Sequence, residues 1–239
     1  MLDRKNIAEL VGTLIFSLGI NLSTQFTEGS QMPQLTSILF SLFSGITITR
    51  AISGGHLNGA VTFGFSMDEF YYKKQSTQAI LSNFLFYYFS QVLGAFIACT
   101  ISYLFYHGHI LSFTSEHFNV KNILMGETFA AFIFVYNILI QSNDRFTKNP
   151  SISTTLIVLG LYAAVNSTHL LSAGCVNPSL ALGHFLASLV LTGKADLTQT
   201  LAYLSATFLG SFIASWIYSF HFTEVVDQKE EDLNFLNSQ

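Results

Sequence analysis

Two asparagines stand out in this sequence as residues that could do chemistry, because each lies in a motif that occurs twice. The first motif reads Gly55-His56-Leu57-Asn58-Gly59-Ala60-Val61, and the second reads Gly174-Cys175-Val176-Asn177-Pro178-Ser179-Leu180. An asparagine followed by proline is typical of a helix N-cap followed by the first helical residue. Each motif therefore predicts a short helix that directs its free N–H groups and positive dipole end toward its asparagine.

Two acidic residues keep a matching distance from these asparagines. Glu9 lies 49 residues before Asn58, and Glu127 lies 50 residues before Asn177. Carboxyl groups in apolar segments are costly unless they are paired or functional. Two matched copies favour a structural role, in which each carboxylate accepts backbone N–H bonds from the nearby motif, and a proton relay is the alternative. His56 either faces the same passage as Asn58 or holds the motif loop together.

The landmarks define two halves, about 7–106 and about 123–222. Gly94 follows Asn58 by 36 residues, and Gly210 follows Asn177 by 33 residues, so the period is about 118 residues. A single duplication of half an apolar chain indicates a membrane protein with a pseudo-two-fold axis.

The composition favours the membrane class and excludes several others. Hydrophobic residues make up 50% of the chain and charged residues only 10%, against roughly 25% charged residues in soluble domains. The sequence contains no basic patch that would indicate a nucleic-acid partner. It shows neither metal-ligand spacing nor a nucleophile constellation, so no metal, cofactor or enzymatic activity is expected.

Six apolar segments are long enough to cross a hydrocarbon core of about 30 Å. They cover residues 7–26, 35–52, 78–106, 123–141, 152–171 and 200–222. Two shorter apolar segments, 59–65 and 178–191, begin at the motif asparagines. The predicted fold is therefore an all-α membrane protein with six transmembrane helices and two re-entrant half-helices. It forms a single domain over 1–239, with a disordered cytosolic tail at 223–239.

The basic residues predict the orientation of these spans. Eight of the ten lysines and arginines fall on the side of the N-terminus, which are Arg4, Lys5, Arg50, Lys73, Lys74, Arg145, Lys148 and Lys229; Lys121 and Lys194 fall on the other side. The positive-inside rule then places both termini in the cytosol. Since three spans per half is an odd number, the second half is inverted, and the two short segments meet near the middle of the membrane. Irregular backbone at that depth is tolerated where it is buried or lines a wet cavity.

At this point the sequence resembles the aquaporin, or major intrinsic protein, family over residues 8 to about 215. The matching segments are 8–13, 53–62, 91–95 and Asn177-Pro178-Ser179. The resemblance implies a channel with one pore per subunit, usually assembled as a homotetramer in the lipid bilayer. On this resemblance the pore motif consists of Asn58, Gly59, Ala60, Asn177, Pro178 and Ser179.

Three residues depart from the family pattern. Gly59 replaces the proline of the first motif, Ser179 replaces the alanine of the second, and Leu180 stands where the family almost always has arginine. The resemblance places the other constriction positions at Ile38, Val165 and Gly174. Together with Leu180 these residues would form an apolar ring without a fixed hydrogen-bond donor. Leu180-Ala181-Leu182 also resembles the unorthodox aquaporins, which lack this arginine.

These observations predict a passive channel for water, for small neutral solutes such as glycerol, urea or ammonia, or for both. Two opposed helix N-termini would exclude ions and protons. A non-conducting structural or junctional membrane protein on the same scaffold is the alternative, motivated by Gly59 and Leu180. A coupled transporter is a third possibility, since inverted repeats also build transporters.

Overall fold

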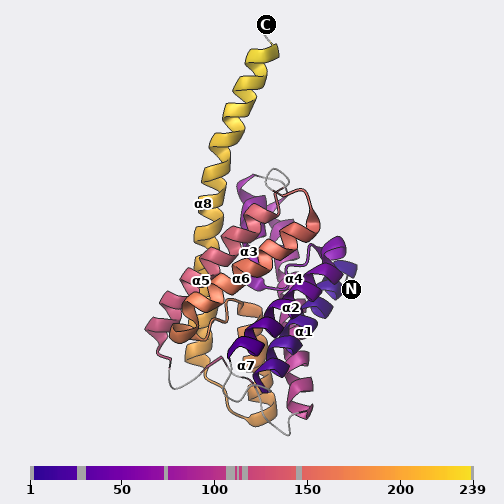
Figure 1. Ribbon diagram of the computed structural model, residues 1–239, viewed down its shortest axis with the longest axis vertical. Helices are drawn as coiled ribbons and strands as arrows, with labels where there is room; N and C mark the ends of the chain where they lie inside the picture. The colour runs from indigo at the N-terminus through magenta and orange to yellow at the C-terminus, as the bar shows by residue number, and fades with distance from the viewer. Residues whose placement is uncertain are drawn as a thin grey trace.

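The computed structural model describes residues 3–25, 31–72, 75–105, 111, 113–114, 118–143 and 147–237. Within these ranges the chain is helical and contains no strand (Figure 1). The helices are α1 (Arg4–Gln25), α2 (Gln31–Ser53), α3 (Gly59–Tyr71), α4 (Thr77–Phe105), α5 (Val120–Gln141), α6 (Pro150–Ser172), α7 (Pro178–Thr192) and α8 (Leu197–Asn237). Phe26, Tyr106, Lys73, Lys74 and Arg145, used above to set span ends and orientation, lie outside the described residues.

Six segments are long and apolar enough to cross a membrane, which confirms the predicted number of spans. They are Arg4–Ser23, Leu35–Ser53, Thr77–Phe105, Val120–Gln141, Pro150–Ser172 and Leu197–His221. The two shorter helices, α3 and α7, begin directly after the motif asparagines. α3 runs to Tyr71, beyond its predicted end at residue 65. α8 continues to Asn237, into the segment 223–239 that the sequence predicts to be a disordered tail.

The two halves of the chain pack in matching ways. α1 packs against α2 and α4, and α5 packs in the same manner against α6 and α8. Gly94 of α4 lies so close to α1 that a Cβ would collide with the carbonyl of Leu10, and Gly210 of α8 would meet the carbonyl of Thr128 in α5 in the same way. Small residues allow such close helix approaches in membranes. The repeated glycines therefore position equivalent helix pairs.

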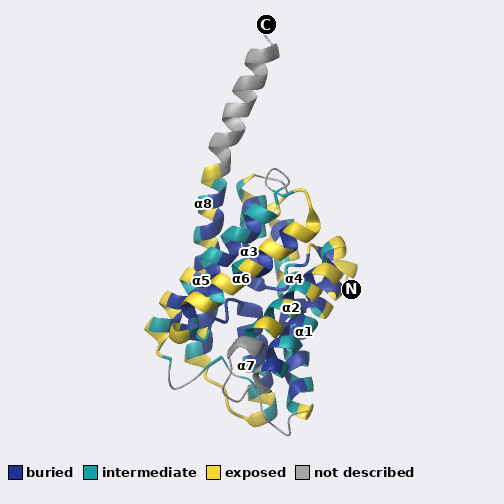
Figure 2. Cartoon of the chain, viewed as in Figure 1, coloured by how far each residue is buried: buried dark blue, intermediate teal, exposed yellow. Residues whose placement is uncertain are grey.

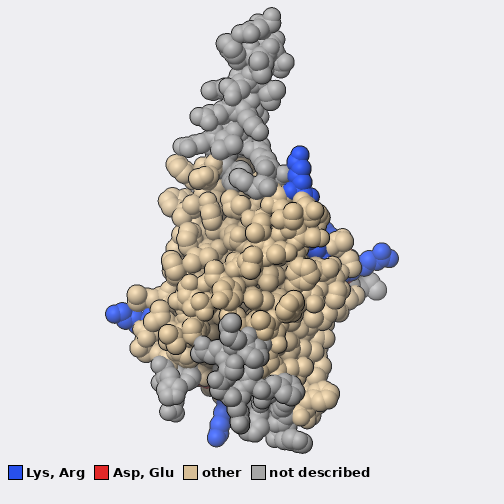
Figure 3. Space-filling model, in the orientation of Figure 1, with Lys and Arg blue, Asp and Glu red and all other residues tan. Residues whose placement is uncertain are grey.

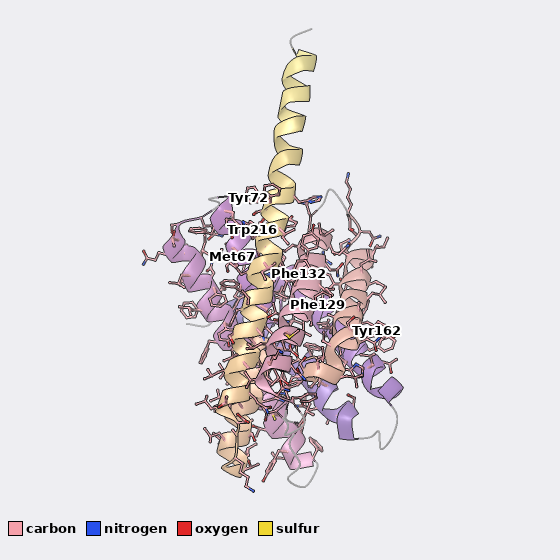
Figure 4. The ribbon with its side chains drawn as sticks, turned by 90° about the vertical axis from the view of Figure 1, so that its left-hand side faces the viewer. Met67, Tyr72, Phe129, Phe132, Tyr162 and Trp216 are labelled. Atoms are coloured by element: carbon pink, nitrogen blue, oxygen red, sulfur yellow. The ribbon has the colours of Figure 1, made fainter. Side chains whose placement is uncertain are left out.

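The sides of the bundle are apolar. Trp216 of α8 is 58% exposed and Phe129 of α5 is 54% exposed, and both project from the side of the bundle in Figure 4. In the view of Figure 3 the described surface is almost free of charge, with basic side chains only at its margins. The buried residues lie on the inward faces of the helices (Figure 2). Such a surface suits contact with lipid, where few charges are tolerated.

The bundle has two ends that differ in what they contain. The end that we call the N-terminal end contains Asp3, the last turns of α3, and the beginning of α6, to which α2 is hydrogen-bonded. The opposite end contains the beginning of α8, where Gln199 donates a hydrogen bond to the carbonyl of Phe118 just before α5. α3 therefore reaches the interior from one end and α7 from the other.

Candidate functional site

The two half-helices meet tip to tip through their N-cap asparagines. Asn58 Oδ1 accepts the N–H of Ala60 at 2.8 Å, and Asn177 Oδ1 accepts the N–H of Ser179 at 3.0 Å. The amide nitrogens cross over: Asn58 Nδ2 donates to the carbonyl of Val176 at 2.9 Å, and Asn177 Nδ2 donates to the carbonyl of Leu57 at 2.9 Å. Each asparagine thus caps its own helix and ties down the opposite loop.

The remaining motif residues form the first turns of these helices. Gly59 and Ala60 begin α3, Pro178 and Ser179 begin α7, and all four are buried. The carbonyl of Ala60 also accepts a hydrogen bond of 2.6 Å from Ser211 of α8. The pore-motif residues named from the sequence are therefore brought together in one place.

Each loop before a capping asparagine holds a strained backbone. Leu57 has φ 52° and Val176 has φ 53°, a left-handed conformation that is uncommon for residues with a side chain and an outlier for a β-branched one. The matching glycines Gly55 and Gly174 have φ 67° and 66°, which glycine adopts without a steric penalty. Strain of this kind persists only where the surroundings fix it.

The two buried acids hold the strained backbone of these loops in place. The carboxylate of Glu9 accepts the N–H groups of His56 at 3.0 Å and Leu57 at 2.8 Å. The carboxylate of Glu127 accepts the N–H groups of Cys175 at 2.9 Å and Val176 at 2.6 Å. These are the backbone hydrogen bonds that the matched positions of the acids predict. Each acid accepts two adjacent backbone N–H groups of its loop, so the acids hold the loops in their strained form.

Hydroxyl groups complete the two loop anchors. Ser53 and Ser172 donate to Glu9 at 2.6 Å and to Glu127 at 2.7 Å. The hydroxyl of Tyr87 donates to the carbonyl of Ser53 at 3.0 Å, and that of Tyr203 donates to the carbonyl of Ser172 at 2.7 Å. Sequence reasoning missed both tyrosines. The signal was present, because Tyr87 and Tyr203 each lie seven residues before the repeated glycines of α4 and α8.

The two motif departures Gly59 and Ser179 fit together. A Cβ at Gly59 would lie 2.5 Å from the ring of Tyr88 and 2.9 Å from Ser179 Oγ, so glycine makes room for both. Ser179 Oγ donates to Gln91 Oε1 at 3.0 Å, and Gln91 Nε2 donates to Glu9 at 2.7 Å. Ser179 therefore connects the second half-helix to the acid of the first half, a connection that sequence reasoning missed.

A wide cavity lies on the side of the motif loops toward the opposite end of the bundle. It has a volume of about 330 Å³ and is lined mainly by apolar side chains, including Phe16, Ile20, Ile38, Leu161 and Val165. Gly174 lines it too, so three of the four residues expected at the constriction share one cavity. Leu180 is not among its lining residues. It is fully buried in the hydrophobic core, one residue after Ser179 in the first turn of α7.

A much narrower cavity of about 30 Å³ lies on the other side of the loops, toward the N-terminal end. Gly54, Gly55 and His56 line it together with Arg50 and apolar residues of α2, α3, α5 and α6. The ring of His56 stacks on Phe65, with 4.6 Å between centroids. His56 therefore lines the narrow cavity, and its stacking on Phe65 also holds the motif loop against α3. The loop before Asn177 thus lines the wide cavity, and the loop before Asn58 lines the narrow one.

The described residues contain no group of three or more His, Cys, Asp or Glu that could hold a metal ion. Cys99 and Cys175 are buried free thiols. The main polar groups of the site are the asparagine amides, the serine and tyrosine hydroxyls and two acids that accept backbone N–H groups. These groups hold the loops in position, and the amides can also contact a passing molecule.

Comparisons with known proteins agree with this geometry. The family model described as Major intrinsic protein matches residues 1–218. The chain is 28% identical to the probable aquaporin TIP2-1 of Oryza sativa subsp. japonica over 230 residues, which covers 89% of this chain and 79% of that protein. It is 27% identical to aquaporin TIP2-3 of Arabidopsis thaliana over 228 residues, covering 89% of this chain and 84% of that protein.

A solved structure shows the same fold. The X-ray structure of the aquaglyceroporin from Plasmodium falciparum is similar with a TM-score of 0.78 and 25% sequence identity, covering 94% of this chain and 98% of that chain. The six apolar helices and this likeness establish an integral, multi-pass membrane protein. The chain therefore belongs to the major intrinsic protein family, whose aquaporins are membrane channels and not enzymes.

Proposed function

We propose that the protein is a passive channel whose pathway joins the wide and the narrow cavity past Asn58 and Asn177. The observation that carries this proposal is the tip-to-tip meeting of two capped half-helices, whose preceding loops line one cavity each. Each asparagine amide has two N–H groups and uses one for the opposite loop. The second N–H can donate to water or to a solute hydroxyl or carbonyl during passage.

The same geometry supports exclusion of ions and protons. α3 and α7 direct their N-termini toward each other, and each N-terminus carries the equivalent of about half a positive charge. In a site away from water these fixed partial charges repel a cation, because little solvent screens them. A neutral molecule experiences no such barrier.

The wide cavity supports passage of small neutral solutes in addition to water. Ile38, Val165 and Gly174 are the proposed constriction residues. Leu180 occupies the position at which the family usually has an arginine, so the proposed constriction lacks the positive charge and hydrogen-bond donors of that arginine. An apolar wall favours solutes with a hydrocarbon face, such as glycerol, and urea and ammonia are further candidates. The likeness to an aquaglyceroporin is consistent with this class.

The proposal includes an orientation and an assembly. The excess of basic residues toward the N-terminal end supports a cytosolic position of both termini under the positive-inside rule. The narrow cavity then faces the cytosol and the wide cavity faces outward. In the lipid bilayer the subunits form a homotetramer, as is usual in the family, with one pathway in each subunit.

Osmotic shrinkage of proteoliposomes tests the proposed pathway, with Val165→Trp as the blocking variant. Val165 lines the wide cavity, and the larger side chain of tryptophan would narrow it, so water flux should fall on the order of tenfold. Leu159→Trp is the matched control, because Leu159 lies on the same helix but is 54% exposed on the outer surface. Leu159→Trp should keep wild-type flux. Equal flux in the two variants would place the pathway elsewhere.

The narrow cavity gives the non-conducting alternative a specific basis. Its volume of about 30 Å³ is close to the volume that one molecule occupies in liquid water. A structural or junctional protein needs no open passage, and it would give wild-type proteoliposomes the same osmotic response as empty vesicles at verified protein density. Shrinkage faster than that of empty vesicles supports the channel.

A further inference from the structure

Arg50, at the end of α2, is held in one position by three hydrogen bonds to α6. Its Nη1 donates to the carbonyl of Pro150 and to Thr154 Oγ1, both at 3.0 Å. Its Nη2 donates to Ser153 Oγ at 3.0 Å. All three acceptors are neutral oxygens, so these contacts fix the guanidinium without neutralising its charge.

Arg50 also borders the smaller of the two cavities on the proposed pathway. Arg50 lines the cavity of about 30 Å³ together with Gly54, Gly55 and His56. On the proposed pathway, a permeating molecule that crosses this cavity therefore passes Arg50. The described residues that line the wide cavity, by contrast, include no lysine or arginine.

Two helix dipoles act on this charge in opposite directions, because Arg50 lies in the last turn of α2, where a cation is favourable. Pro150 begins α6, and a cation at a helix N-terminus opposes the helix dipole. A neutral side chain with N–H donors could make hydrogen bonds to the same oxygens. The arginine therefore adds something that the contact between α2 and α6 does not require, namely a permanent positive charge at the passage.

We propose that Arg50 is a specificity-determining residue of the conduction pathway, which rests on the proposed channel function. Its guanidinium repels cations at the narrow end and donates hydrogen bonds to neutral solutes that carry an oxygen. Arginine has five N–H donors in a fixed fork, and the contacts to α6 occupy three of them. The charged donor that the wide cavity lacks is thus supplied on the other side of the motif loops.

Urea and guanidinium form a matched pair of probes, because they are similar in size and shape and differ in charge. We would measure uptake of each labelled compound into proteoliposomes at concentrations far below denaturation, with valinomycin present so that potassium exit balances the charge. Wild-type protein should pass water and exclude guanidinium. Arg50→Gln should raise guanidinium uptake on the order of tenfold, as expected for removing one nearby charge at intermediate dielectric, and Arg50→Lys should keep exclusion.

Lys5→Gln is the matched control, because Lys5 is an exposed cation at the same end that does not line the narrow cavity. It should behave as wild type, which separates a charge in the passage from general surface charge. Arg50→Gln protein that passes water and still excludes guanidinium would overturn the assignment and reduce Arg50 to a clamp between helices. Wild-type vesicles that pass neither water nor urea would overturn the channel itself, and the assignment with it.

Arg50→His tests the charge within one folded variant. A histidine is mostly charged near pH 5.5 and mostly neutral near pH 8, so guanidinium uptake through this variant should be several-fold higher at the higher pH. Wild-type protein at both pH values is the reference, because His56 lines the same passage. A variant that responds to pH no more than wild type would contradict the assignment.

Discussion

At the scale of single residues, the unusual members of the two motifs are best understood as a set. Gly59 lacks the fixed φ of the proline that the family pattern has at this position. Because glycine has no Cβ, it leaves room for the ring of Tyr88 and the hydroxyl of Ser179. That hydroxyl donates to Gln91, which is fully buried and needs partners for its amide. One departure from the family pattern therefore makes the other possible.

We expect Gly59→Ala to destabilise the protein by about 1–3 kcal/mol, because an added methyl group in a packed site forces its neighbours to move. Tyr88→Ala should remove the collision with the ring, so the double variant should lose less stability than the sum of the two single variants. Thermal unfolding of purified protein in detergent measures these differences. Strictly additive losses would show that Gly59 and Tyr88 do not interact.

At the scale of the elements, the half-helices depend on the acids that hold the loops before them. Both acids are fully buried and accept two backbone N–H groups and one serine hydroxyl. They differ in one respect. Glu9 also accepts a hydrogen bond of 2.7 Å from Gln91 Nε2, whereas among the described residues Glu127 accepts only from Ser172, Cys175 and Val176.

Replacement of the acids by glutamine should therefore have unequal effects. Glu9→Gln places an amide N–H₂ among N–H donors and leaves buried donors without an acceptor, each at a cost of about 1–3 kcal/mol. Glu127→Gln should cost less, because one donor fewer faces it. The thermal unfolding midpoint should fall further for Glu9→Gln than for Glu127→Gln. The reverse order would argue that the contact with Gln91 contributes little.

The sequence predicts those parts of this arrangement that rest on local signals or on the repeat. The apolar segments, the capping asparagines and the matched acids each follow from residue type and spacing. Two contacts had no local or repeat signal in the sequence. Arg50 bonds to residues of α6 about a hundred positions away, and Tyr88 approaches Gly59 from another helix. Contacts between distant segments depend on how helices pack, which the periodicity of one helix does not determine.

At the scale of the whole molecule, the two halves are interlocked rather than side by side. α3 of the first half packs against α5 and α8 of the second, and α7 of the second half packs against α4 of the first. Ser215 of α8 donates to the carbonyl of Gly64 in α3 at 3.2 Å. Each half-helix thus finds much of its packing surface in the other half, and the two crossed asparagine bonds join the halves at the centre.

This interlocking predicts that neither half is stable alone. We expect halves produced by dividing the chain between residues 109 and 110, where the two repeats join, to copurify when expressed together and to restore water flux in proteoliposomes. Each half alone should aggregate or be degraded, because α3 or α7 would expose buried polar groups such as Asn58 or Asn177 to lipid, at several kcal/mol each. The measurements are pull-down through a tag on one half, size-exclusion chromatography and osmotic shrinkage. A first half that is monodisperse and protease-resistant by itself would show that the repeat folds independently. The crossed asparagine bonds would then only join two halves that are already folded.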